Sequence, residues 1–188
     1  MNIEDQLILV DENDKRWGKL EKSLVHELGL LHRAFSIFIL NNKGELLIQQ
    51  RADEKYHSPG LWTNTCCSHP RFNEEMVDAI ERRLKEEMGM KCKTEFAFSF
   101  IYKVKFENGL TEYEYDHVYI GISDELPIPE KSEVKNWKYI NLSELSSDIL
   151  NHPENYTEWL KICLPKANEL LTSTFKNHSF KKNQNVSI

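Results

Sequence analysis

The chain has 188 residues, of which 40% are hydrophobic and 11% aromatic, so one domain of this length can bury a core without disulfides. It carries 24 lysine and arginine residues against 30 aspartate and glutamate residues, which gives a formal net charge of -6. This balance argues against a general nucleic-acid-binding protein, which needs a basic face, but not against a small anionic substrate, because electrostatic steering depends on local charge.

The sequence shows no pattern of export or membrane insertion. Residues 1–5 lack the basic-then-apolar pattern of a signal peptide, and no stretch approaches the ~18 apolar residues of a membrane span. We therefore expect a cytoplasmic protein that does not enter a membrane and whose four cysteines are reduced thiols. Cys66 and Cys67 are adjacent, which argues against a disulfide between them.

Apolar runs separated by turn residues predict the first elements of the chain. These are, in chain order, a strand over 7–10, a turn over 11–14, a short helix over 21–28, a strand over 34–40, a turn over 41–44 and a return strand over 45–51. The two strands around the second turn are expected to form a hairpin. Residues 57–60, His-Ser-Pro-Gly, then break the chain before Trp62.

Helical periodicity is strongest over 73–88, where Met76, Ile80 and Leu84 fall within one sector at ~100° per residue. Gly89 favours an end of the helix at that point. The remaining elements expected from the pattern are, in chain order, a strand over 94–106, a strand over 112–122, a short strand over 137–142 and a helix over 155–174.

Two details of these later elements are specific enough to test. Alternation places Phe96 and Phe98 on one face of their strand. Pro165 lies inside the last helix, so a kink or a break is expected there. Strands with a few flanking helices, not regularly interleaved, predict an α+β fold. We expect a single domain over 1–175, followed by a polar, disordered tail over 176–188.

Glu87 interrupts the apolar face of the predicted helix, because it lies about 20° from Ile80 on the helical wheel. A carboxylate on a buried face is costly unless it is paired or binds a metal ion. An arginine or lysine partner, or an edge position open to water, would explain Glu87 as well as a metal would.

Glu112, Glu114 and Asp116 share one face of the strand over 112–122 and continue the apolar row of that face. Such a row fits the wall of a cavity that holds a cation or a shared proton. The alternative is that the row leaves the core near residue 117 and the acids meet solvent. The pattern alone favours this second interpretation.

Cys67 and His69 are separated by one residue, so in an extended segment both side chains point the same way. They could be a nucleophile and a base, two ligands, a thiol beside a metal site, or simply a buried cysteine and a capped histidine. His26 and His32, with His69 and the acidic strand, could form a mixed nitrogen and oxygen site of the kind that suits Zn, Mn or Mg. Spacing alone does not show that they converge.

The region 82–90 resembles the Nudix box, whose acids hold Mg²⁺ on a diphosphate. Ser68 occupies the glycine position, Glu74 and Arg82 fit the pattern, and Arg83 replaces a glutamate. The loss of that acid points to the fold rather than to the hydrolase reaction.

These residues together resemble the type I isopentenyl-diphosphate isomerases, which use a Nudix-like fold. The resemblance covers roughly residues 4–172 and rests on the segments 31–36 and 62–70, the degenerate box and Glu112-Tyr113-Glu114. The string Thr-Asn-Thr-Cys-Cys-Ser-His-Pro within it is highly specific. The resemblance implies a Nudix-like mixed sheet flanked by helices. It also implies that the chain converts isopentenyl diphosphate to dimethylallyl diphosphate by a 1,3 proton shift through a tertiary carbocation.

The resemblance also implies roles for particular residues. Tyr102 would assist Glu114, and the π face of Trp159 would stabilise the carbocation. The implied catalytic set is Cys67, Glu114, Tyr102 and Trp159. The cations that would contact the diphosphate are Lys22, Arg51, Lys55 and Arg83, each of which alone would be taken for a solvated surface charge.

Two metal ions are implied by the same resemblance. The first would be Mn²⁺, Zn²⁺ or Mg²⁺, and its ligands would be His26, His32, His69, Glu112 and Glu114. The second would be Mg²⁺, held by Glu87 and bridging the substrate diphosphate. Two rival functions remain: a Nudix hydrolase that uses Glu86 and Glu87 on Mg²⁺, and a non-enzymatic metal- or diphosphate-binding protein.

Overall fold

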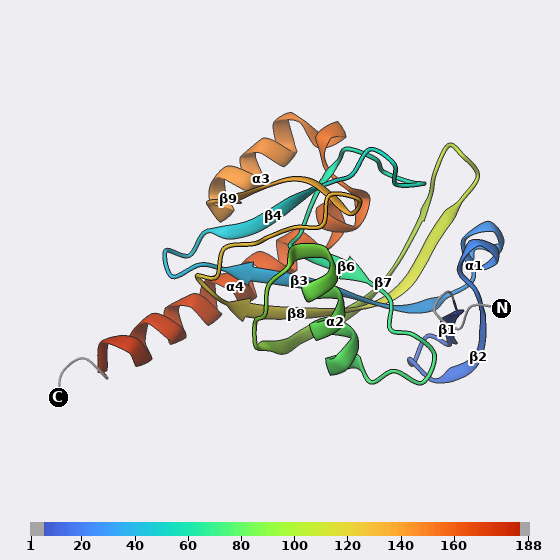
Figure 1. The fold of residues 1–188 in the computed structure, drawn as a ribbon, viewed down its shortest axis with the longest axis horizontal. Helices are drawn as coiled ribbons and strands as arrows, with labels where there is room; N and C mark the ends of the chain where they lie inside the picture. Colours follow the sequence, from blue (N-terminus) through green and yellow to red (C-terminus); the bar gives the residue numbers. More distant parts are fainter. Residues whose placement is uncertain (1–5, 185–188) are drawn as a thin grey trace.

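The central strand of the fold is β3 (His32–Leu40), which is apolar on both faces. The computed structural model describes residues 6–184, and within them nine strands form one mixed sheet (Figure 1). Strand β3 pairs antiparallel with β4 (Leu46–Arg51) and β6 (Cys66–Ser68), and parallel with β8 (Thr111–Ile122). The neighbouring strand β4 and two distant segments, β6 and β8, are therefore brought to one strand.

The other strands extend the sheet on both sides of β3. They are β1 (Gln6–Val10), β2 (Arg16–Glu21), β5 (Trp62–Thr63), β7 (Thr94–Lys105) and β9 (Val134–Ile140). Strand β7 pairs antiparallel with β8, β9 and β5 pair with β4, and β1 pairs with β2.

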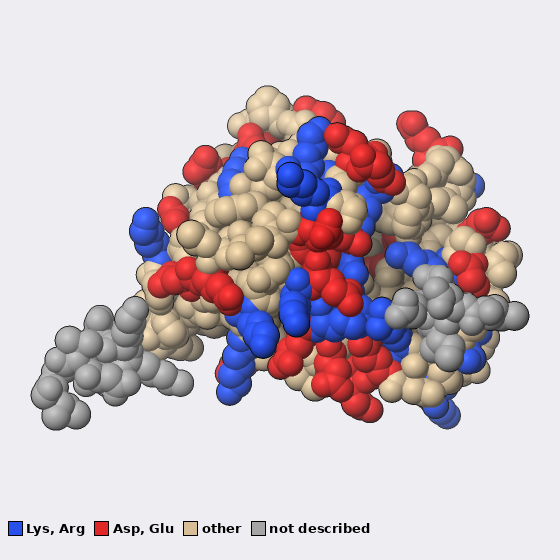
Figure 2. Space-filling view, in the orientation of Figure 1, with Lys and Arg blue, Asp and Glu red and all other residues tan. Residues whose placement is uncertain are grey.

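Helices cover both faces of this sheet. They are α1 (Lys22–Leu28), α2 (Met76–Met88), α3 (Leu142–Asn151) and α4 (Glu158–Gln184), with a 3₁₀ turn at Pro153–Asn155. Helix α2 ends at Gly89, whose φ of 63° and whose close approach to the carbonyl of Ile128 both require glycine. Acidic and basic side chains are interspersed on the face of the molecule that Figure 2 shows.

Alternate side chains of β3 enter two separate cores. Phe38 and Leu40 pack with Leu160 and Leu164 of α4, on one side of the sheet. Phe35, Ile37 and Ile39 point the other way and pack with Ile80 and Leu84 of α2. Burial on both sides fixes β3, and the side chains that project from its ends and partners share that rigidity.

The structure confirms the expected α+β fold, the hairpin of β3 and β4, the short helix α1 and the long helix α2. The sequence analysis missed β2, β5, β6 and α3. No helix among residues 6–184 is long and apolar enough to cross a membrane.

Three expectations differ from the structure. Phe96 does not share a face with Phe98, because a bulge lies between them, and Phe96 is 56% exposed. Helix α4 continues without a break through Pro165, since Leu160, Leu164 and Leu171 bury one side of it. It also continues to Gln184, where a disordered tail from residue 176 was expected, and it projects from the body of the molecule (Figure 1). Residues 185–188 of that tail lie outside the described residues.

Candidate active site

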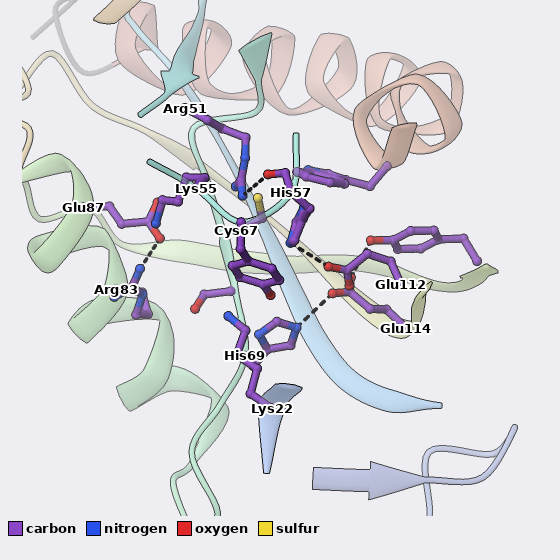
Figure 3. A pocket seen from close by; sticks show the side chains of 14 residues that line it. Lys22, Arg51, Lys55, His57, Cys67, His69, Arg83, Glu87, Glu112 and Glu114 are labelled. Carbon is purple, nitrogen blue, oxygen red and sulfur yellow. Dashed lines mark hydrogen bonds and ion pairs between the residues drawn. The ribbon is translucent and has the colours of Figure 1, made fainter. Parts of the chain in front are cut away.

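A pocket opens where α1, β4, β6, α2, β7, β8 and α4 approach one another (Figure 3). Its lining contains eleven of the thirteen residues that the sequence analysis assigned to a site: Lys22, Arg51, Lys55, Cys67, His69, Arg83, Glu87, Tyr102, Glu112, Glu114 and Trp159. The other two, His26 and His32, lie directly beside its wall in a cluster with His69 and Glu112.

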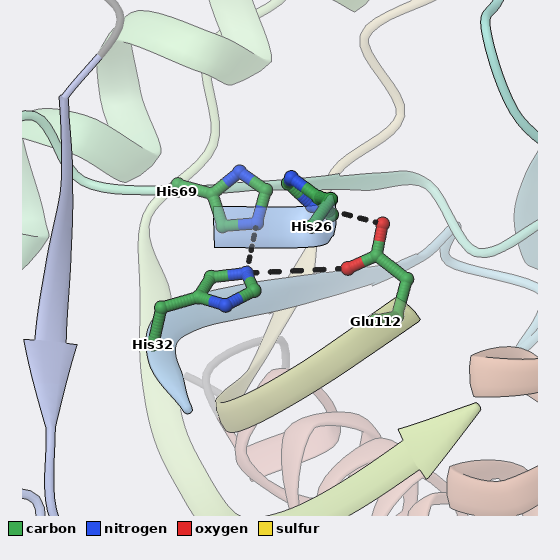
Figure 4. Close-up of side chains that lie close together, drawn as sticks. All are labelled: His26, His32, His69 and Glu112. Atoms are coloured by element: carbon green, nitrogen blue, oxygen red, sulfur yellow. Dashed lines mark hydrogen bonds and ion pairs between the residues drawn. The ribbon is translucent and has the colours of Figure 1, made fainter. Parts of the chain in front are cut away.

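Three histidines and one glutamate form a metal-binding cluster at one end of the pocket (Figure 4). One potential ligand atom from each of His26, His32, His69 and Glu112 lies within 4.8 Å of the others. The Nε2 atoms of His32 and His69 are 3.2 Å apart, and Nε2 of His26 is 3.2 Å from Oε1 of Glu112. The three histidines and Glu112 therefore converge, which their spacing in the sequence could not show.

The backbone orients two of these imidazoles. Nδ1 of His26 donates to the carbonyl of Lys22 at 2.6 Å, and Nδ1 of His32 donates to the carbonyl of Leu30 at 2.9 Å. Because a carbonyl oxygen only accepts, each Nδ1 carries the proton and each Nε2 is left to face the cluster.

The polar atoms of the cluster fit a divalent ion. Nε2 of His26 and Oε2 of Glu112 are buried and have no hydrogen-bond partner among the described residues. Burial lowers the pKa of His69 to about 4, even though Glu114 opposes the shift. Burial would raise the pKa of Glu112, but the adjacent imidazoles of His26 and His57 hold it well below its usual range. A neutral imidazole and an ionised carboxylate are the forms that bind metal.

His26 differs from His69 in its proton affinity. Burial lowers the pKa of His26, but the adjacent Glu112 carboxylate outweighs it and raises the pKa overall. A proton therefore competes with a metal ion at Nε2 of His26.

Glu114 adjoins the cluster and lies between two strands. The parallel register pairs His32 of β3 with Glu114, and the antiparallel register pairs Tyr102 of β7 with it. Oε1 of Glu114 is 2.9 Å from Nε2 of His69, and Oε2 accepts a hydrogen bond from the Tyr102 hydroxyl at 2.7 Å. Burial and Glu112 would raise the pKa of Glu114, but His32 and His69 lower it, so the carboxylate is ionised.

Cys67 reaches the pocket from β6, where it pairs with Ser36 of β3. Burial raises the pKa of the Cys67 thiol to about 12, although Arg51 opposes the shift. The thiol therefore keeps its proton at neutral pH. Its neighbour Cys66 points into the core on the α2 side.

Two of the cations, Lys55 and Arg83, lie at the other end of the pocket, and carboxylates partner both of them (Figure 3). Arg83 pairs with Glu87, and Lys55 pairs with Glu133. A nitrogen of Arg83 also lies 3.4 Å from Glu133. The second oxygen of Glu87 accepts a hydrogen bond from Gln49 at 2.9 Å. Glu87 thus has the arginine partner that the sequence analysis gave as one explanation of its place on a buried face.

Arg51 and Trp159 form the wall between the two ends. The Arg51 guanidinium lies 5.3 Å from the centre of the Trp159 ring and donates to the carbonyls of His57 and Ser58, each at 3.2 Å. The indole N–H of Trp159 donates to Thr63 at 2.8 Å, which fixes the ring in place.

Several site residues escaped the sequence analysis. His57 lies with its Nε2 2.9 Å from Oε1 of Glu112, and Tyr56 lines the pocket beside it. Glu133 partners the cations. All three lie in segments without periodicity, so no local signal marked them. Asp116 is buried and accepts a hydrogen bond from Ser36 at 2.7 Å, so the interpretation that the acidic row meets solvent is wrong.

The degenerate box has a structural role here. Arg82 of α2 binds both carboxylate oxygens of Glu74, at 2.6 and 2.8 Å, and Glu74 in turn accepts from the backbone N–H of Arg71. This bidentate pair fastens the loop before α2 to the helix.

Solved structures share the fold at low sequence identity. A protein from Deinococcus radiodurans has a TM-score of 0.71 at 21% identity, covering 86% of this chain and 98% of that one. A MutT protein from Methanosarcina mazei has a TM-score of 0.61 at 16% identity, covering 74% of this chain and 94% of that one. At such identities the similarity shows the fold alone.

Relatives of similar sequence identify the family of this chain. The NUDIX domain family model matches residues 30–161. A protein of Aromatoleum aromaticum named isopentenyl-diphosphate Delta-isomerase 2 is 51% identical over 165 residues, covering 88% of this chain and 87% of its own. A protein of the same name from Photorhabdus laumondii is 50% identical over 159 residues, covering 85% of this chain and 90% of its own. The chain belongs to the isopentenyl-diphosphate Delta-isomerase family, as the resemblance predicted.

Proposed function

We propose that this pocket converts isopentenyl diphosphate to dimethylallyl diphosphate, with Cys67 and Glu114 as the acid–base pair. The observation that carries the proposal is the convergence in one pocket of a protonated thiol, an ionised carboxylate, an indole wall and four cations. The reaction itself is the one named for the relatives at 50% and 51% identity.

The reaction needs one proton donor and one proton acceptor. A proton adds to the terminal CH₂ carbon, the double-bond electrons form the new C–H bond, and the adjacent carbon becomes a tertiary cation. Loss of a proton from the carbon beyond it returns an electron pair as the new double bond. Burial raises the pKa of the Cys67 thiol, and His32 and His69 lower the pKa of Glu114, so at neutral pH one group can donate a proton and the other can accept one, which supports their assignment as the pair.

The neighbours of this pair stabilise charge without trapping it. The π face of Trp159 can stabilise a cation, and an indole is a poor nucleophile. Tyr102 donates to Oε2 of Glu114 and so fixes the carboxylate and its proton affinity. Lys22, Arg51, Lys55 and Arg83 would bind the diphosphate.

Metal ions complete the proposal. The cluster of His26, His32, His69 and Glu112, with Glu114 as a fifth ligand, would hold Mn²⁺, Zn²⁺ or Mg²⁺. Such an ion would supply positive charge that lowers the proton affinity of Glu114. Glu87 would bind Mg²⁺ together with diphosphate oxygens.

Two substitutions test the acid–base pair. Cys67→Ala and Glu114→Gln should each lower isomerisation by at least ~10²-fold, measured by proton NMR of dimethylallyl diphosphate formation. Circular dichroism controls for the fold of both variants. Bound-metal content controls for the cluster in Cys67→Ala, whereas Glu114→Gln also changes a proposed ligand. Near-wild-type turnover by Cys67→Ala would remove the thiol from the mechanism. Rapid Mg²⁺-dependent phosphate release from a nucleotide panel would favour a hydrolase instead.

A further inference from the structure

His57 touches the metal-binding cluster, although it is not one of the four residues whose ligand atoms converge. Its Nε2 lies 2.9 Å from Oε1 of Glu112, and the side chain is 8% exposed. Its other nitrogen, Nδ1, is buried and has no hydrogen-bond partner among the described residues. Because a carboxylate oxygen only accepts, Nε2 carries the ring proton and donates a hydrogen bond to Glu112.

The two oxygens of Glu112 have different surroundings. Oε1 accepts the hydrogen bond from Nε2 of His57 and also lies 3.2 Å from Nε2 of His26. Oε2 has no hydrogen-bond partner and faces Nε2 of His32 at 4.0 Å (Figure 4). One oxygen is therefore held, and the other is left as a ligand atom inside the cluster.

The His57 ring is itself held on several sides. It stacks on Phe106, with ring centres 5.3 Å apart and planes inclined by 14°, and it meets Trp159 edge-on at 5.7 Å. Tyr56 meets it edge-on at 4.4 Å. Arg51 binds the backbone carbonyl of His57 at 3.2 Å, so both the ring and its backbone are fixed.

We propose that His57 is a positioning residue of the metal centre, which holds Oε1 of Glu112 by a hydrogen bond and so aims Oε2 at the ion. The inference rests on the metal site of the proposed function. Groups that hold a ligand in this way commonly contribute ~10–100-fold to metal affinity.

The placement of the rings separates this role from direct ligation. The centre of the His57 ring is 6.3 Å from that of His26, whereas the centres of the His26, His32 and His69 rings are 5.0 to 5.9 Å apart. No atom of His57 belongs to the set of ligand atoms that converge within 4.8 Å, and its Nε2 contacts the cluster through Oε1 of Glu112.

The matched variants are His57→Gln and His57→Asn, which carry the same amide on side chains of different length. The glutamine nitrogen can take the place of Nε2 and donate to Glu112, whereas the asparagine nitrogen takes the place of Nδ1 and falls short. His117→Asn is the remote control, since His117 also lies beside a carboxylate, with Nε2 3.1 Å from Asp14.

The measurement is competition of Co²⁺ against a chelator, in the absence of substrate, with the Co²⁺ absorption spectrum recorded on the same samples. We expect His57→Asn to lower Co²⁺ affinity by ~10–100-fold, His57→Gln to restore it to within a few-fold of wild type, and His117→Asn to leave it unchanged. The Co²⁺ spectrum of His57→Gln should keep the wild-type band positions, because the ligand set is unchanged. Thermal unfolding of the metal-free proteins reports separately on the fold.

Wild-type Co²⁺ affinity in His57→Asn would overturn the proposal. A shifted Co²⁺ spectrum with equally weak binding in both variants would overturn it in favour of His57 as a ligand. Because no substrate is present, neither outcome depends on whether the protein isomerises isopentenyl diphosphate.

Discussion

The two ends of the pocket differ in how their charges are matched. At the histidine end, Nε2 of His26 and Oε2 of Glu112 are buried without hydrogen-bond partners among the described residues. At the cation end, Arg83 pairs with Glu87 and Lys55 pairs with Glu133. The histidine end therefore has free ligand atoms for a metal ion. At the cation end the charges are already paired within the protein, so a diphosphate would have to compete with Glu87 and Glu133 for Arg83 and Lys55.

The largest expected effect comes from removing charge at the histidine end. Glu112→Gln removes the one carboxylate of the four-residue cluster, so we expect it to lose metal binding and to lower isomerisation by more than the ~10–100-fold typical of an outer hydrogen-bonding partner. Metal content after dialysis and product formation by NMR are the measurements. Glu87→Gln is the matched control at the cation end, and it should retain the ion bound by the histidines. Equal loss of that ion in both variants would break the distinction between the ends.

A pH series gives an intermediate effect. Glu112 raises the pKa of His26 above its ordinary value of 6.5 despite the burial of the ring, so His26 keeps its proton to a higher pH than a free imidazole would. A protonated imidazole cannot bind metal, so metal affinity should rise with pH through that raised pKa and then level off. Chelator competition from about pH 6 to about pH 8 measures the rise, which approaches tenfold per pH unit below the pKa if one proton is released. An affinity independent of pH over this range would contradict the shift at His26.

The smallest effect is expected at the cation end, and it has the opposite sign. Glu133→Gln removes a competitor for Lys55 and Arg83, so the diphosphate should bind more tightly. Partly exposed pairs are worth ~0.2–1 kcal/mol, which corresponds to a KM lowered by no more than about fivefold. The gain should shrink as salt is added. Asp53→Asn, which breaks an exposed pair with Lys135, is the control and should leave KM unchanged. A raised KM for Glu133→Gln would show that this carboxylate helps to bind substrate.

Local patterns predicted the elements that build the pocket but not its full lining. Helix α2 and strand β8 have strong periodicity and β3 is a continuous apolar run, so their existence and the shared face of Glu112 and Glu114 were predictable. Whether that face was buried depended on the parallel pairing of His32 with Glu114, which brings together residues distant in the chain. No local pattern contains that information.

Other features were missed for identifiable physical reasons. The residues of β2 are half-buried or exposed, so their sequence shows no apolar row. The bulge that turns Phe96 outward does not interrupt the alternation of apolar residues in the sequence, so no pattern marked it. His57 belongs to an irregular loop held by Arg51, and Glu133 precedes β9 in another such segment. The specific string around Cys67 marked the family, but the family pattern did not point to either of these residues.

The central claim is that one pocket adds and removes a proton on a five-carbon diphosphate. Proton NMR of isopentenyl diphosphate in deuterated buffer, with metal-loaded protein and Mg²⁺, tests it most directly. The account predicts that dimethylallyl diphosphate forms with solvent deuterium on carbon, and that Cys67→Ala and Glu114→Gln suppress this product. Formation of the product without any deuterium in it, or its undiminished formation by both variants, would contradict the account.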